Sequence, residues 1–106
     1  MGIYIDRANI PYGSKFMCHM MADTLTELHA FAKQLGIKRC WYHCNASYPH
    51  YDICTETRII ALAFGANLVD RHTIIKYGIQ LRNEREKRSS KKNESKLFKE
   101  SQIKLF

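Results

Sequence analysis

Apolar and polar residues alternate at strand spacing near the start of the chain. The alternation over Ile3–Asp6 predicts a first strand that ends at an aspartate. A proline and a glycine within residues 10–15 predict a loop. The mostly apolar run Phe16–Ala22 predicts a second strand. Because strand side chains alternate between the two faces, His19 is expected to face away from its two neighbours.

An apolar stripe at helical spacing predicts a helix over residues 25–35, ended by Gly36. The stripe consists of Leu25, Leu28, Ala32 and Leu35. Asp23 and Thr24 stand where a side-chain oxygen can accept an orphan backbone N–H, so Asp23 is expected to be mainly a cap. Thr24 also fits the capping-box spacing with the glutamate three residues later. His29 flanks the stripe, and capping does not explain it.

The second half of the chain alternates short apolar runs with helical patterns. Residues 37–44 predict a third strand, and residues 45–54, which include a proline, predict a loop. Thr55 is expected to cap a second helix. A short strand over residues 66–69 and a last helix from near His72 complete the order. The pattern predicts a small single-domain α/β fold with about four short strands and about three helices.

Three aspartates share one kind of position, at the end of a strand or just before a helix. They are Asp6, Asp23 and Asp52. In sheets with crossover helices, functional residues gather at strand ends and helix N-termini. This shared placement makes the three carboxylates candidates for a common site.

Composition divides the 106 residues into two parts. Residues 1–83 contain the apolar stripes and are expected to form the compact domain. Residues 84–106 carry eight Lys/Arg against four Asp/Glu, out of a net charge of +7. We expect this basic extension to be partly disordered or to dock as a helix. It could bind nucleic acid, and its apolar residues, such as Phe98, leave docking on another copy of the chain open.

No apolar run approaches the length of a membrane span, and the first residues lack the features of a signal peptide. We therefore expect no membrane partner, a cytoplasmic location and reduced cysteines. Cys40, His43 and Cys44 are loosely zinc-like. The chain has no CxxC pair, which argues against a structural zinc site.

The ordered set of polar motifs resembles a bacterial and bacteriophage family of short proteins known as domain of unknown function family 4031. The likeness covers about residues 3 to 80. The matching positions are Asp6, Pro11, Gly13, His19, Asp23, Thr24, Glu27, Leu28, His29, His50, Tyr51, Asp52, Arg58, Gly65 and Ala66. The resemblance implies a compact α/β fold and a phage origin, but no activity. Members often carry an acidic residue where this chain has Pro49.

The candidate ligand-binding residues are Asp6, His19, Asp23, His29, His50, Tyr51, Asp52 and Arg58. We expect His19, His29, His50 and Asp52 to face one pocket. An arginine in the first turn of a helix could bind phosphate, and a tyrosine could stack on a base. Each residue also has a structural interpretation, such as a core histidine with a hydrogen-bond partner or an Arg58 paired with Asp52 or Glu56.

Two functions of different classes follow from this set. The first is binding of a phosphorylated small molecule, a nucleotide, without a metal; in a phage this could sequester a nucleotide signal of host defence. The alternative is a metal-dependent phosphoesterase or nuclease that holds a divalent metal through His19, His50 and Asp52. Nucleic-acid binding through residues 84–106 is a second alternative. The sequence assigns no catalytic residue and leaves enzymatic activity undecided.

Overall fold

The computed structural model describes the backbone of residues 2–92 and the side chains of residues 2–87. In chain order its helices and strands are β1 (Ile3–Ile5), β2 (Ile10–Tyr12), β3 (Lys15–Ala22), α1 (Leu25–Gln34), the 3-10 helix η1 (Arg39–Trp41), β4 (Tyr42–His43), β5 (His50–Cys54), α2 (Thr55–Ala63), β6 (Asn67–Leu68) and α3 (Arg71–Lys92). The α/β class and the three helices are confirmed. The described residues form six strands rather than four.

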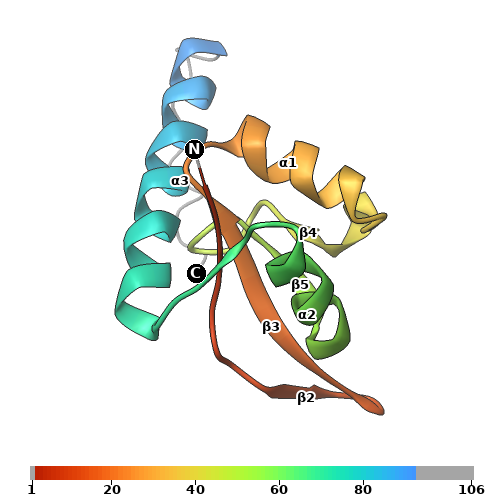
Figure 1. Ribbon diagram of the computed structural model, residues 1–106. Helices are drawn as coiled ribbons and strands as arrows, with labels where there is room; N and C mark the ends of the chain where they lie inside the picture. The colour runs from red at the N-terminus through yellow and green to blue at the C-terminus, as the bar shows by residue number, and fades with distance from the viewer. Residues whose placement is uncertain (1, 93–106) are drawn as a thin grey trace.

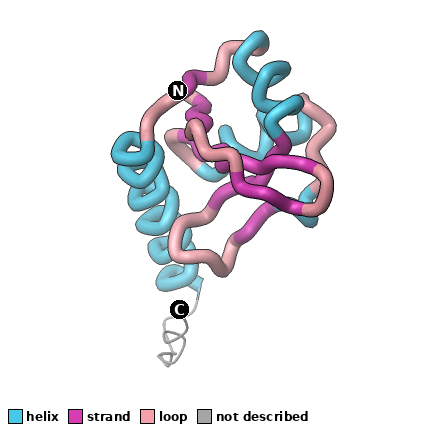
Figure 2. The backbone as a smooth tube through the Cα atoms, turned by 90° about the horizontal axis from the view of Figure 1, so that it is seen from below, coloured by secondary structure: helices cyan, strands magenta, loops and turns pink. Residues whose placement is uncertain are grey.

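The strands form one mixed sheet with the order β4-β5-β3-β1-β6, and β2 pairs with β3. The central strand β3 is antiparallel to both β1 and β5, whereas β6 is parallel to β1. The strands lie between α3 on one side and α1 and α2 on the other (Figure 1). Figure 2, seen from below, shows the same separation of α3 from the other helices.

The two faces of the sheet are buried by different helices. Met20 pairs with Tyr51, and α1 covers this face with three buried residues, Leu25, Leu28 and Ala32. On the opposite face, the ring of Tyr4 stacks on Tyr77 of α3 at a centroid distance of 3.7 Å. The long helix α3 covers only one end of its face. The rest of that face carries the polar side chains of β3 and β5.

Two expectations for the middle of the chain are wrong. Residues 37–44 form η1 and the two-residue β4 instead of a strand. Their first part, residues 38–40, is exposed, so no burial favours an extended pairing. The expected loop ends at Pro49, and β5 follows with a buried residue at every second position. This alternation is the ordinary pattern of a strand, hidden by polar residues at His50 and Asp52.

The loop expected over residues 10–15 is also wrong in part, because β2 and β3 form a hairpin with a two-residue turn. Gly13 has φ 62°, the positive value that type II′ hairpin turns require at this position. Pro11 is tolerated because β2 lies at an edge of the sheet. The hairpin extends away from the rest of the sheet at the bottom of Figure 1.

The helix caps differ from expectation. The N-cap of α1 is Thr24, whose Oγ1 accepts the N–H of Glu27 at 3.2 Å. Asp23 instead accepts a hydrogen bond from the Tyr4 hydroxyl at 3.2 Å. The N-cap position of α2 is Cys54, without a side-chain cap, and Thr55 is the first helical residue.

Helix α3 continues through residue 83, where the sequence suggested a boundary, and reaches Lys92. Past residue 83, Glu84 accepts the N–H of Leu25 at 2.8 Å, and Arg85 binds the carbonyl oxygens of Cys44 and Ala46. The expectations for the rest of the basic extension fall on residues 93–106, outside the described residues.

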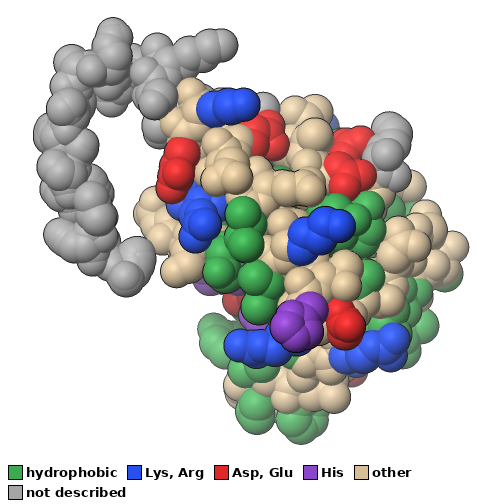
Figure 3. Space-filling view, turned by 90° about the vertical axis from the view of Figure 1, so that its left-hand side faces the viewer, with side chains coloured by type: hydrophobic (Ala, Val, Ile, Leu, Met, Phe, Trp, Pro, Cys, Tyr) green, Lys and Arg blue, Asp and Glu red, His purple; other side chains and the backbone are tan. Residues whose placement is uncertain are grey.

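On the face that bears α3, basic and acidic side chains are interspersed (Figure 3). The described residues therefore do not present a continuous basic surface on this face. None of the described helices combines the length and apolar character that crossing a bilayer requires.

Helix α3 approaches the sheet closely at Gly78. A Cβ at this position would lie 2.8 Å from Cβ of Tyr48 and 3.1 Å from Cε of Met21. Glycine in a helix interior costs about 1 kcal/mol relative to alanine. Close packing against Tyr48 therefore explains a residue that the helix itself disfavours.

Replacing this glycine should destabilise the fold. Gly78→Ala gains about 1 kcal/mol of helix propensity but loses about 1–3 kcal/mol through overpacking, because the contacted Tyr48 atom lies next to the backbone. We expect the free energy of unfolding in urea to fall by up to about 2 kcal/mol. The exposed neighbour Gln80 supplies the control Gln80→Ala, which should change it by less than about 0.5 kcal/mol. A Gly78→Ala protein more stable than wild type would contradict this packing.

Candidate metal centre

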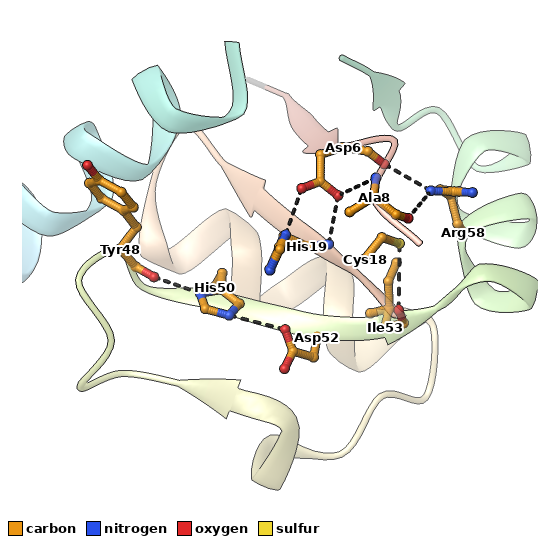
Figure 4. Close-up of polar contacts among 9 residues, drawn as sticks. All are labelled: Asp6, Ala8, Cys18, His19, Tyr48, His50, Asp52, Ile53 and Arg58. Carbon is orange, nitrogen blue, oxygen red and sulfur yellow. Dashed lines mark hydrogen bonds and ion pairs between the residues drawn. The ribbon is translucent and has the colours of Figure 1, made fainter. Parts of the chain in front are cut away.

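The register of three strands places four polar side chains on one face of the sheet. His19 of β3 pairs with Asp52 of β5, and His43 of β4 pairs with His50 of β5. Paired residues in an antiparallel sheet point to the same face, as do residues two apart along a strand. His19, His43, His50 and Asp52 therefore meet on the face that α3 leaves partly uncovered. Figure 4 shows three of them, His19, His50 and Asp52.

His19 is held by Asp6, which follows the last residue of β1. Its Nδ1 lies 2.6 Å from Asp6 Oδ2, and its backbone N–H donates to Asp6 Oδ1 at 2.9 Å. The Asp6 side chain is only 10% exposed. Because Nδ1–H donates to the carboxylate, the lone pair of Nε2 is free to face the cluster.

His50 is held by a carbonyl oxygen rather than a carboxylate. Its Nδ1 lies 2.7 Å from the carbonyl oxygen of Tyr48, which can only accept, so Nδ1 carries the proton. Its Nε2 then lies 3.1 Å from Asp52 Oδ1. A neutral ring would direct a lone pair at that carboxylate oxygen. The contact is favourable only if His50 carries a second proton or a cation lies between the two groups.

Asp52 receives a further histidine on its other oxygen. His43 Nε2 lies 2.9 Å from Asp52 Oδ2, and the His43 ring stacks on His50 with centroids 5.1 Å apart. The ring of His19 meets His50 edge to face at 5.0 Å. One carboxylate is thus surrounded by three imidazoles that approach from three strands.

The donor atoms converge as metal ligands do. Each of His19, His50 and Asp52 offers one ligand atom, and these three atoms lie within 4.8 Å of one another. Imidazole and carboxylate suit Zn²⁺, Mn²⁺ and Fe²⁺. Histidines that bind metals usually donate their other ring N–H to a carboxylate or a backbone carbonyl. His19 donates to a carboxylate, that of Asp6, and His50 donates to a backbone carbonyl, that of Tyr48.

The pKa values of the cluster reflect the same contacts. The hydrogen bond to Asp6 raises the pKa of His19 despite the opposing effect of burial. Burial by itself raises the pKa of Asp6, but the hydrogen bonds and charge of His19 outweigh it and lower that pKa. Burial likewise opposes ionisation of Asp52, yet its contact with His50 and the nearness of His43 and His19 lower its pKa. Both carboxylates are therefore ionised at neutral pH.

Helix α3 positions the carbonyl that holds His50. The loop between β4 and β5 is fixed at its start by Arg85, which donates to Cys44 O at 2.6 Å and Ala46 O at 2.9 Å. Its end is fixed at Tyr48, which packs against Gly78 and lies under the Arg82 guanidinium. The docking of α3 thus sets the orientation of one candidate ligand.

The structure separates the predicted site residues into groups. It brings Asp6, His19, His50 and Asp52 together. His29 lies on the α1 face, where its Nδ1 is 2.9 Å from the hydroxyl of the buried Tyr51. The expectation that His29 shares the pocket is therefore wrong, because Tyr51 alternates with His50 and Asp52 along β5. Asp23 lies beside Tyr4, away from the cluster.

Arg58 forms hydrogen bonds with a loop and does not pair with the acidic side chains suggested for it. Its Nη1 donates to the carbonyl oxygens of Asp6 and Ala8 at 3.1 and 3.0 Å, and Nη2 donates to Asn9 Oδ1 at 3.2 Å. The suggested pairing with Asp52 or Glu56 does not occur. The guanidinium instead holds the chain just after β1, where it leaves the Asp6 carboxylate facing His19.

Two groups that contribute to the candidate centre were not predicted from the sequence. The sequence pattern singles out His43 only in a loosely zinc-like group with Cys40 and Cys44, not as a neighbour of His50 and Asp52. The Tyr48 contribution is a backbone carbonyl, which no side-chain pattern can indicate. A period-2 pattern through His50 and Asp52 would have identified β5, and with it the shared face.

The sequence profile of a family described as "Protein of unknown function (DUF4031)" matches residues 3–81. The chain belongs to this family, and the resemblance drawn from its motifs is confirmed. Every residue of the candidate centre lies within the matched range. Comparisons with curated proteins and with solved structures give no significant match.

The Asp6–His19 pair should give the metal-free protein a bell-shaped pH dependence of stability. Because folding raises the pKa of His19, this residue stabilises the fold fully at pH values below its ordinary pKa of 6.5. That stabilisation is lost as the pH rises through the pKa of His19 in the folded protein. The lowered pKa of Asp6 contributes stability present above its ordinary 3.8 and lost as pH falls through the folded value. The pair should therefore contribute most between those two ordinary values.

The free energy of unfolding in urea is measured for wild type and for Asp6→Asn at a series of pH values, with a chelator present. The difference between the two proteins at each pH is the contribution of the pair. The exposed Glu86 supplies the control Glu86→Gln, whose difference from wild type should stay small throughout. A wild-type minus Asp6→Asn difference that is constant from pH 3 to pH 9 would show that the pair is not coupled as described.

Proposed function

We propose that the chain binds one divalent transition-metal ion and uses it to hydrolyse phosphoesters. The ligands in this proposal are His19 Nε2, His50 Nε2 and the carboxylate of Asp52. The observation that carries it is that His19, His50 and Asp52 each place one ligand atom within 4.8 Å of the others, while Asp6 and the Tyr48 carbonyl occupy Nδ1 of the two rings. Three protein ligands leave a position for water, as in catalytic rather than structural sites.

A bound ion would supply a Lewis acid and a water molecule of lowered pKa. Asp6 and Tyr48 would keep the two imidazoles in the tautomer that ligates. His43, bonded to Asp52 and about half exposed, is placed to accept a proton from water at the edge of the cluster. In the overall reaction, the water oxygen ends on phosphorus, the P–O bond to the leaving group breaks, and a proton ends on the leaving oxygen.

The competing explanation is a structural one. A protonated His50 could satisfy both Tyr48 and Asp52, and the cluster would then only connect three strands. Partial exposure argues against this explanation, since His19 is 30% and Asp52 27% exposed, while the core beneath is fully buried. A cluster that only joined strands would gain little from remaining open to solvent, where hydrogen bonds to charged groups are weak.

Metal binding is the first test. We expect chelator-treated wild type to take up about one equivalent of Zn²⁺ or Mn²⁺ in calorimetric titration. His19→Ala, His50→Ala and Asp52→Asn should each weaken binding at least about tenfold, as should Asp6→Asn through its effect on His19. His29→Ala is the matched control, because it removes a histidine from the other face of the sheet and should leave metal affinity unchanged.

Circular dichroism and thermal unfolding must show that each variant remains folded. Absence of saturable binding by folded wild type would refute the centre. Equal loss of affinity in His29→Ala and His50→Ala would also refute it, since the metal would then lie elsewhere.

Catalysis is tested separately with the metal-loaded protein. We expect release of nitrophenolate from bis(p-nitrophenyl) phosphate or from p-nitrophenyl phosphate, abolished by chelation and by Asp52→Asn and retained in His29→Ala. Preference for one of the two esters would identify diester or monoester chemistry. Metal binding without turnover of either ester would overturn the hydrolytic part of the proposal and favour simple binding.

A further inference from the structure

A cavity of about 570 Å³ adjoins the candidate centre at Asp52. It lies between the β2–β3 turn, the segment that follows α1, and the residues at the end of β5. Its volume falls within the range of about 300–1,000 Å³ typical of small-molecule sites. The residues that line it and enter the argument are Tyr12, Lys15, Lys38, Trp41 and Asp52.

The cavity arises because β4 is shorter than β5. β4 pairs only with His50 and Tyr51 of β5, so Asp52–Cys54 have no strand beyond them on that side. The chain leaves α1 and passes through residues 35–41 across this opening. The hairpin turn around Gly13 encloses it from the other side. Asp52 therefore belongs both to the candidate centre and to the cavity wall.

The walls combine an aromatic surface with positive charge. Trp41 and Tyr12 meet edge to face at a centroid distance of 5.8 Å, which fixes the indole in the wall. Lys15 and Lys38 are the basic residues of the lining, and Asp52 is its one acidic residue among those described. On its other side Asp52 contacts two histidines, with His43 Nε2 at 2.9 Å and His50 Nε2 at 3.1 Å. The cavity thus suits an anion that carries an aromatic ring.

We propose that this cavity binds a nucleoside monophosphate or a closely similar nucleotide. The base stacks on Trp41, as bases do on aromatic side chains. The two lysines attract the phosphate, which lies toward Asp52 and the adjoining centre. This orientation rests on the proposed hydrolytic function, because it brings the phosphoester to the metal. Binding of the base to Trp41 does not depend on the metal.

Trp41 is the one tryptophan of the chain, so its fluorescence reports directly on this cavity. Titration of the full chain with AMP should quench that fluorescence in a saturable manner. Adenosine should bind about tenfold more weakly, because it lacks the phosphate that the lysines attract. Inorganic phosphate alone should leave the fluorescence unchanged.

Variants locate the binding site. By calorimetry, Trp41→Ala should weaken AMP binding about tenfold through loss of stacking. Lys15→Ala combined with Lys38→Ala should remove most of the difference between AMP and adenosine. Lys87→Ala, an exposed lysine of α3, is the control and should bind AMP as wild type does. Equal affinity of wild type for AMP and adenosine, or no quenching by AMP, would overturn the proposal.

The titration is repeated with chelator-treated wild type and with folded His50→Ala. AMP binding that persists in both, without any metal uptake by wild type, supports this cavity and refutes the metal centre. Metal uptake by wild type without AMP binding supports the centre and refutes the cavity proposal. The two proposals therefore fail by different measurements.

Discussion

The pairing of β3 with β5 is the constraint on which the rest of the structure depends. Its register puts His19 opposite Asp52 on one face and Met20 opposite Tyr51 on the other. A slip of one residue would send Asp52 into the core and Tyr51 into solvent. Burial of Tyr51 and of the neighbouring apolar residues therefore fixes the geometry of the polar cluster. The chemistry on one face is positioned by the hydrophobic effect acting on the other.

Contacts from outside the β3–β5 pair orient the histidines of the polar cluster. Arg58 holds the chain after β1, which keeps Asp6 on His19, while α3 holds the loop that presents the Tyr48 carbonyl to His50. Each candidate ligand is thus oriented by a group that is itself fixed by tertiary contacts. Each of the two imidazoles has Nδ1 occupied, and one ligand atom each from His19, His50 and Asp52 lies within 4.8 Å of the others, an arrangement that a cation would stabilise.

The sequence predicted much of the fold because its strongest signals are local. The stripe of α1, the runs of β1 and β3 and the glycines that end helices gave those elements nearly in their observed positions. The sequence also assigned Asp6, His19, His50 and Asp52 to one site, through their places near element ends. It failed for His29, because a flanking position on α1 does not reveal which face of the sheet the helix covers. Gly78 and the Tyr48 carbonyl could not be predicted, since both act through contacts distant in the chain.

The central claim is that His19, His50 and Asp52 form one metal centre. Anomalous diffraction from crystals grown with Zn²⁺ tests it most directly. The account predicts one strong peak about 2.0–2.1 Å from Nε2 of both histidines and about 2.0–2.2 Å from an Asp52 oxygen, with Asp6 and the Tyr48 carbonyl still bonded to the opposite nitrogens. A map without a peak there, in which His50 still bonds directly to Asp52, would contradict it.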